Sequence, residues 1–67
     1  MMRAIPTYED KAGNIIQFRT IHNIPGFSYR VVRNGLAVDW LRNDQRPSAK
    51  VAAYYAEKHN SGPAGAD

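Results

Sequence analysis

Hydrophobic and polar residues alternate most regularly between positions 27 and 42 of this 67-residue chain. Two alternating runs, Phe27–Arg33 and Leu36–Arg42, lie on either side of the dipeptide Asn34-Gly35. Asn-Gly accepts the positive φ angles of a type I′ turn, whose twist matches that of two antiparallel strands. The pattern therefore predicts a tight β-hairpin.

Two more strands are predicted before this hairpin. The first, Arg3–Glu9, contains Pro6, which has no amide hydrogen for a ladder bond, so we expect this strand at a sheet edge. The second, Ile15–Ile21, is rich in β-branched and aromatic residues. Short clusters of turn residues, Asp10–Asn14 and His22–Gly26, connect the strands. The expected arrangement is an antiparallel meander.

A single helix is predicted after the strands, over positions 49–59, which contain four alanines and no glycine or proline. Asp44 and Ser48 are both suitable N-caps, and the sequence leaves this choice open. Residues 61–67 have nothing to bury and are expected to form a disordered tail. We therefore expect one α+β domain over residues 1–60: a three- to four-stranded antiparallel sheet with one C-terminal helix on one face, in the order β-β-β-β-α.

The hairpin register predicts which side chains share a face. A two-residue loop places Tyr29 opposite Trp40, and Arg30 opposite Asp39. The face with Tyr29 and Trp40 is the more apolar, so we expect it beneath the helix, and core packing is favoured over base stacking for both rings. Arg30, Asp39 and Leu41 would then face solvent, with a cross-strand ion pair worth roughly 0.2–1 kcal/mol. The remaining expected core residues come from the second strand and the helix: Ile16, Phe18, Val51, Ala52 and Tyr55.

Composition and charge limit the classes of function. Nine Lys and Arg residues against six Asp and Glu give a net charge of +3, and six of the nine cations are arginine. Guanidinium groups suit bidentate contact with phosphate or carboxylate, so either a nucleic acid or an acidic protein surface is compatible. The chain has no cysteine, no apolar run of the ~20 residues that span a membrane and no signal-peptide pattern. We expect a cytoplasmic protein without a membrane partner.

The sequence contains no catalytic or metal-binding motif. Its two histidines, His22 and His59, have no adjacent carboxylate or second histidine at ligand spacing. Phosphate-binding loops, nucleophile elbows and paired carboxylates are also absent. So short a chain offers little concave volume for a small-molecule substrate. We therefore expect a non-enzyme with no catalytic residue, metal or cofactor.

The uncovered face of the sheet is the candidate binding surface. Interleaved arginines on an open sheet can contact DNA phosphates or enter a major groove, whereas scattered charge is also typical of an ordinary solvated face. The leading hypothesis is a DNA-binding module, monomeric or weakly dimeric. The alternative is an interaction or inhibitor protein. It would bind the acidic surface of a larger host assembly and block that assembly. The candidate contact residues are Arg19, Arg30, Arg33, Arg42, Leu41 and Tyr54.

The segment from Phe27 to His59 carries a resemblance to known domains. Three antiparallel strands lead to a helix, with Trp40-Leu41 closing the last strand and residues 48–55 on the helix. This plan is similar to the sheet-reading DNA-binding domains at the N-termini of phage tyrosine recombinases, and plant AP2-type domains share it. The extra first strand and the absence of a basic N-terminal arm depart from that pattern. The size and plan also resemble small accessory proteins of phages and mobile elements, many of which block a host protein.

Overall fold

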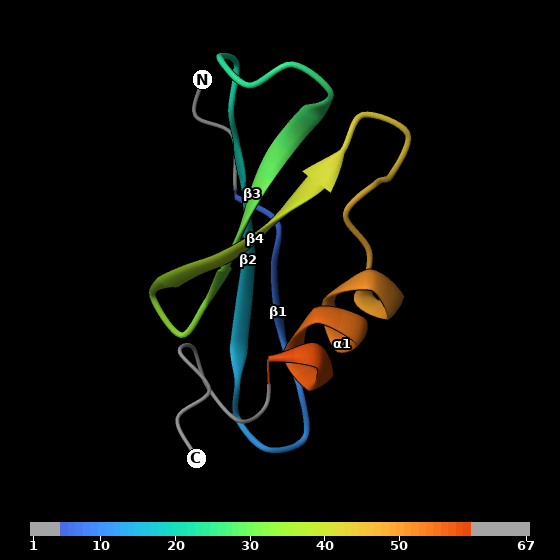
Figure 1. Cartoon of the computed structure of the whole chain (residues 1–67). Coiled ribbons are helices and arrows are strands. Elements are labelled where there is room, and N and C mark those ends of the chain that lie inside the picture. Colours follow the sequence, from blue (N-terminus) through green and yellow to red (C-terminus); the bar gives the residue numbers. More distant parts are fainter. Residues whose placement is uncertain (1–4, 60–67) are drawn as a thin grey trace.

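A computed structural model of the chain describes residues 5–59 (Figure 1). Its strands lie in the order β1-β2-β3-β4, and every neighbouring pair is antiparallel. The predicted α+β meander with one C-terminal helix is therefore confirmed. The first four residues and the tail expected to be disordered lie outside the described part of the chain. The elements are β1 (Thr7–Glu9), β2 (Ile15–Thr20), β3 (Phe27–Arg33), β4 (Leu36–Arg42) and α1 (Ala49–Lys58).

Turn residues fix the connections between the strands. Asn34 and Gly35 have φ angles of 51° and 84°, as the two central positions of a type I′ turn require. Pro25 and Gly26 form the centre of a type II turn, in which Gly26 has a φ of 89°. The short connections that the sequence predicted are thus present, and β1, the strand after the proline, lies at a sheet edge as expected.

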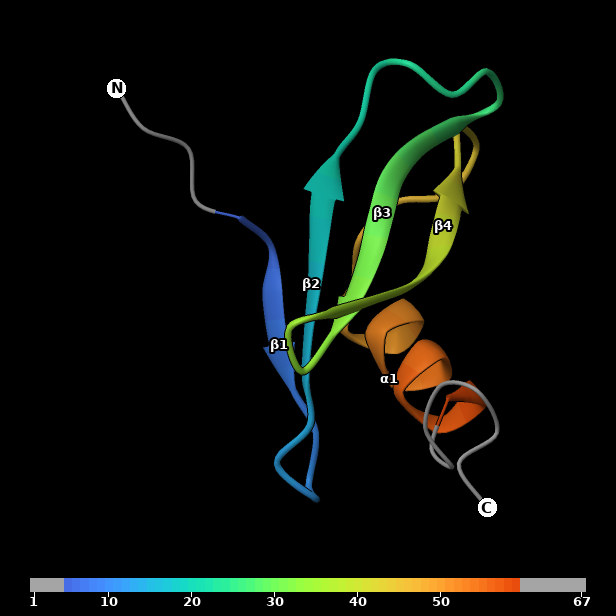
Figure 2. The ribbon, with the colours of Figure 1, turned by 60° about the vertical axis from the view of Figure 1, so that its left-hand side comes forward.

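Helix α1 covers one face of the sheet (Figures 1 and 2). Ser48 is its N-cap, since the Ser48 hydroxyl accepts a hydrogen bond of 3.2 Å from the amide of Val51. This observation resolves the choice between the two candidate caps. Ile16 and Phe18 of β2 are buried as predicted. The core cluster between helix and sheet comprises Ile16, Phe18, Val31, Leu41, Ala52, Tyr55 and Ala56.

The register of the β3–β4 hairpin agrees with the prediction at both ends and differs from it in the middle. Arg33 pairs with Leu36 beside the turn, and Phe27 pairs with Arg42 at the far end, both as expected. One extra residue in β4 and one in β3 form two bulges whose shifts cancel. Between the bulges the pairs are displaced by one residue: Val31–Asp39, Arg30–Trp40 and Tyr29–Leu41.

The bulge at Val38 of β4 reverses the faces of the residues that follow it, because a one-residue slip moves each side chain to the other side of a sheet. Leu41 is completely buried and Trp40 is 44% exposed. The predictions that Trp40 forms the core floor and that Leu41 faces solvent are therefore wrong. The sequence-based register assumed an unbroken ladder, and the bulge places the branched aliphatic side chain beneath the helix instead of the larger indole.

The same bulge turns Asp39 toward the helix. Its Oδ2 atom lies 3.1 Å from Lys58 Nζ and 3.2 Å from His59 Nε2, at the C-terminal end of α1. The predicted pairing of Arg30 with Asp39 is wrong, and Arg30 instead has Trp40 opposite it. Asp39 gains a cation at a helix end where positive charge is favoured by the helix dipole, which gives a physical reason for this orientation.

Candidate nucleic-acid interface

A row of exposed side chains crosses the side of the sheet turned away from α1. Arg19 on β2 pairs directly with Arg30 on β3, and Arg30 pairs directly with Trp40 on β4. Directly opposed residues point to the same side, with Cβ atoms about 4.5–5.5 Å apart. All three side chains are exposed. We call the side formed by these residues and their neighbours the open face: Gln17, Arg19, Arg30, Val32, Ala37 and Trp40.

The local charge of the open face is positive around this row. Two like charges directly opposite each other are unfavourable unless an anion lies between them, so Arg19 and Arg30 together favour an anionic partner. Among the described strand residues, the only carboxylate that alternation places on this side is Glu9. Glu9 pairs with Ile15 of β2, which lies four residues before Arg19, about 13 Å away. Asp39 does not neutralise them, because it faces the helix.

Aromatic side chains gather where the open face meets the free edge of β4. The rings of Phe27 and Trp40 have centroids 6.2 Å apart and planes inclined by 53°. Tyr54 of α1, one of the candidate contact residues, is 58% exposed. These rings line a groove of about 620 Å³ between β4 and the helix, with carboxylates of Asp39 and Asp44 on its wall. The other side chains that line this aromatic groove are Arg42, Gln45 and Tyr55.

The contacts of Asp39 hold the helix end against β4. Partial burial by itself raises the pKa of Asp39, but hydrogen bonds from the backbone amide of Trp40 and from Lys58 and His59 outweigh it, so the pKa is lowered. The hydrogen bond to Asp39 and its negative charge raise the pKa of Lys58. Lys58 Nζ also lies 5.7 Å from the ring centroid of Tyr55, within cation–π range. The Asp39 carboxylate and the Lys58 ammonium are therefore ionised and bonded to each other near neutral pH.

The structure brings some of the predicted contact residues together and separates others. Arg19 and Arg30 are neighbours on the open face, and Arg42 lies at its edge beside the aromatic groove. Leu41 is buried and unavailable for contact. Arg33 pairs with the buried Ile16 and therefore lies on the helix side of the sheet, half-buried. The expectation that it would act with the open-face arginines is not supported by this placement.

Sequence reasoning missed Trp40 as a surface residue. It was assigned to the core because its pairing with Tyr29 was expected from the turn alone. The bulge in β4 places Trp40 outside the core. No glycine or proline in the sequence marks the position of this bulge. Its exposure adds an aromatic ring to a sheet face that is expected from the sequence to carry arginines, Asp39 and aliphatic residues.

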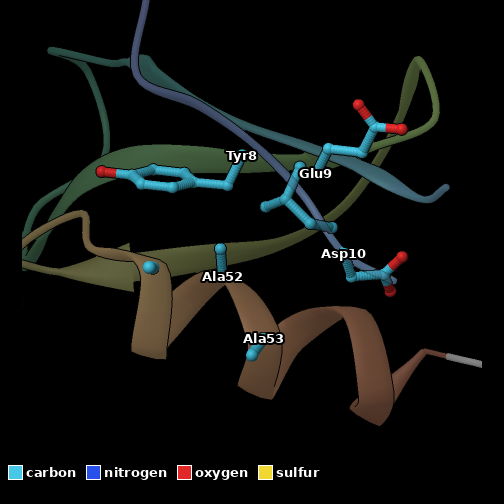
Figure 3. Close-up of a pocket in the computed structure, with 7 residues that line it drawn as sticks. Tyr8, Glu9, Asp10, Ala52 and Ala53 are labelled. Atoms are coloured by element: carbon cyan, nitrogen blue, oxygen red, sulfur yellow. The ribbon is translucent and has the colours of Figure 1, made fainter. Parts of the chain in front are cut away.

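A smaller crevice lies on the other side of the sheet, between β1 and the first half of α1 (Figure 3). It holds about 120 Å³ and is mainly apolar, because Ala49, Ala52 and Ala53 leave space opposite Tyr8 and Ile16. The labelled Glu9 carboxylate points away from the helix in this view. With so little volume, the crevice is too small for a typical ligand.

The chain matches no protein-family model, no curated protein sequence and no solved structure. The one described helix is too short to span a membrane. Within residues 5–59, no three histidine, cysteine or carboxylate side chains are grouped as a metal site would require. The interpretation of function therefore depends on the geometry and charge of the open face.

Proposed function

We propose that this protein is a small non-enzymatic module that binds nucleic acid through the open face of its sheet. The observation that carries this proposal is the row formed by Arg19, Arg30 and Trp40 across three adjacent strands. Guanidinium groups form bidentate hydrogen bonds with phosphate oxygens, and an exposed ring supplies apolar contact to a base. Charge and aromatic character thus occur side by side on one surface.

The rest of the fold supports this surface mechanically. Buried residues of β2, β3 and β4 pack under α1, so the strands that hold the arginines are fixed from behind. Arg42 extends the positive surface to the free edge of β4. Phosphate contacts would position the nucleic acid without reading its sequence, so we expect affinity that varies little with base order.

Charge-matched variants test the proposal. Arg30→Gln removes one positive charge from the open face, and Lys50→Gln removes one from the exposed surface of α1. We expect Arg30→Gln to weaken binding of a labelled oligonucleotide, measured by fluorescence anisotropy, and Lys50→Gln to have little effect. The dependence of log affinity on log salt should become shallower by roughly 0.7 to 0.9 for the lost phosphate contact. Equal affinities and equal salt slopes for both variants would contradict the proposal.

A second candidate function is carried by the free edge of β4. This seven-residue strand ends the sheet, so one side of its backbone has no neighbouring strand among the described residues. Leu36 and Trp40 are exposed along it. An unpaired edge with apolar side chains can accept a strand from a partner protein, as in an inhibitor of a larger assembly.

The two candidates respond differently to one variant and to salt. Leu36→Asp places a negative charge on the free edge but away from the arginine row. We expect it to abolish strand addition by a protein partner and to weaken nucleic-acid binding only slightly. A partner captured by the wild-type protein but not by Leu36→Asp, with shallow salt dependence, would favour the protein-interaction candidate.

A further inference from the structure

We infer that the nucleic acid bound by the open face is single-stranded, and that Trp40 is the platform on which one of its bases stacks. This inference rests on the proposed function and adds to it the strandedness of the ligand. It starts from the finding that Trp40, the only tryptophan of the chain, is 44% exposed. An unpaired base presents a flat apolar surface that an exposed indole can cover.

Trp40 is held in place and open at the same time. Its ring contacts Phe27 at a centroid distance of 6.2 Å with an inclined geometry, which is a favourable arrangement for two aromatic rings. Phe27 is half-buried, so it provides a support on one side of the indole. The backbone amide of Trp40 also donates to the side chain of Asp39 at 2.8 Å. The exposed remainder of the ring is therefore presented in a fixed position rather than on a mobile loop.

Arginines lie on two sides of this ring. Arg30 is directly across from Trp40 on β3. Arg42 follows it two residues along β4, which corresponds to about 6.6–6.8 Å. A stacked base is linked to a phosphate on each side, so cations that flank an aromatic ring suit a nucleic-acid strand running over it. Arg19 extends the positive row by one more strand, about 4.8 Å further.

The shape of the surface disfavours a duplex. Three inter-strand spacings make the four-stranded sheet about 14 Å wide before its side chains are counted, whereas the major groove of B-DNA is about 12 Å wide. Among the described residues, no helix or extended arm projects from the open face toward a groove. In a duplex the base faces are covered by neighbouring bases, so the exposed indole would have nothing to stack on without unstacking a step. A single strand imposes no such cost.

Fluorescence of the sole tryptophan tests the inference directly on the full chain. We expect oligothymidylate at low salt to quench the emission of Trp40, because stacking brings the base against the indole. A DNA duplex of equal length should bind more weakly and quench less. Tighter binding of the duplex would overturn the inference.

Substitutions separate stacking from general apolar contact. Base stacking on an aromatic side chain predicts that Trp40→Ala weakens single-strand binding roughly 5- to 150-fold, and that Trp40→Phe restores most of the loss. Leu36→Ala is the matched control, because it shortens another exposed apolar side chain of the same strand. Circular dichroism verifies that each variant is folded, and Trp40→Phe keeps the test valid should the alanine variant unfold.

The outcomes distinguish this inference from the proposed function. Equal single-strand affinities for Trp40→Ala and Leu36→Ala would overturn the stacking role, while a loss confined to Arg30→Gln would still support nucleic-acid binding. Loss in neither Arg30→Gln nor Trp40→Ala would overturn both. A loss in Trp40→Ala that Trp40→Phe does not restore would also contradict stacking, because the aromatic ring itself would then not be the feature that matters.

Discussion

The two sides of strand β4 have different surroundings, although their residues alternate within a few positions of the chain. Toward the helix, Leu41 is fully buried and Asp39 bonds the last residues of α1. Away from the helix, Trp40 is exposed beside Arg30. One side holds the fold together and the other is available to a partner. A single bulge determines which residues belong to which side.

This difference shows how a local irregularity can change which residues are exposed on a sheet face. In an unbroken hairpin, Asp39 would lie opposite Arg30 and neutralise it, and Trp40 would be hidden under the helix. The bulge at Val38 removes the carboxylate from the open face and adds the indole to it. Bulges are frequent next to functional sites because they redirect side chains in this way. The proposed interface thus depends on one inserted residue more than on the composition of the strand.

The substitution with the largest expected effect is at Leu41, and it tests whether the two sides of β4 differ as described. We expect Leu41→Ala to lower the free energy of unfolding by about 2–5 kcal/mol, because it leaves a cavity in a packed core. Trp40→Ala should cost about 1 kcal/mol or less, as is typical of exposed positions. Urea denaturation followed by far-UV circular dichroism measures both.

The unbroken register makes the opposite prediction, with Trp40 essential for stability and Leu41 replaceable. A larger loss for Trp40→Ala than for Leu41→Ala would therefore show that the bulge is absent in solution. Leu36→Ala again serves as the reference, since Leu36 is exposed on the same strand but lies before the bulge, where both registers agree.

The parts of the fold that could be predicted are those with local chemical causes. Asn34-Gly35 and Pro25-Gly26 require particular backbone angles, and these angles fix the hairpin turn and the entry into β3. The alanine-rich segment after Ser48 has a strong intrinsic helix preference. Each of these signals lies within a few residues of the feature it determines. These local signals were sufficient to predict the element order and the antiparallel meander. The alternation in β2 was sufficient to predict that Ile16 and Phe18 are buried.

The middle of the hairpin could not be predicted because its register is decided by distant contacts. Val38 and Ser28 are the two extra residues, and neither is a glycine or proline that would mark a bulge in the sequence. The balance is set by the burial of Leu41 under α1 and by the bonds from Asp39 to residues 19 and 20 positions later in the chain. An alternation pattern contains no information about such contacts.

The candidate site shows the same division. Arg19 and Arg30 were correctly expected on the uncovered side, because the β2–β3 pairing has no bulge. The placements of Leu41 and Trp40 were wrong, because both follow the bulge in β4. Arg33 was grouped with the other arginines by residue type, whereas its pairing with Ile16 puts it on the helix side. Residue chemistry therefore predicted a face that carries arginines, and the register decided which residues lie on it.

A substitution with a smaller expected effect tests the contacts on the helix side of β4. Asp39→Asn removes the charge that bonds Lys58 and His59, and we expect it to cost on the order of 1 kcal/mol near neutral pH. The pKa of Asp39 is lower in the folded protein than its ordinary value of 3.8, so its contribution is present above that pH and is lost as the pH falls below it. The pKa of Lys58 is raised above 10.5, so its share is lost only in strongly basic solution.

Stability measured between pH 6 and pH 2 should therefore fall less steeply in Asp39→Asn than in the wild-type protein. Some acid dependence should remain, because hydrogen bonds from Asn14 also lower the pKa of Asp10. Asp44→Asn is the matched control, since it changes an exposed carboxylate in the loop before α1. If Asp39→Asn and Asp44→Asn had the same acid profile, Asp39 would not be bonded to the helix end. It would then be free to face Arg30, and the open face would lose the positive charge on which the proposed interface depends.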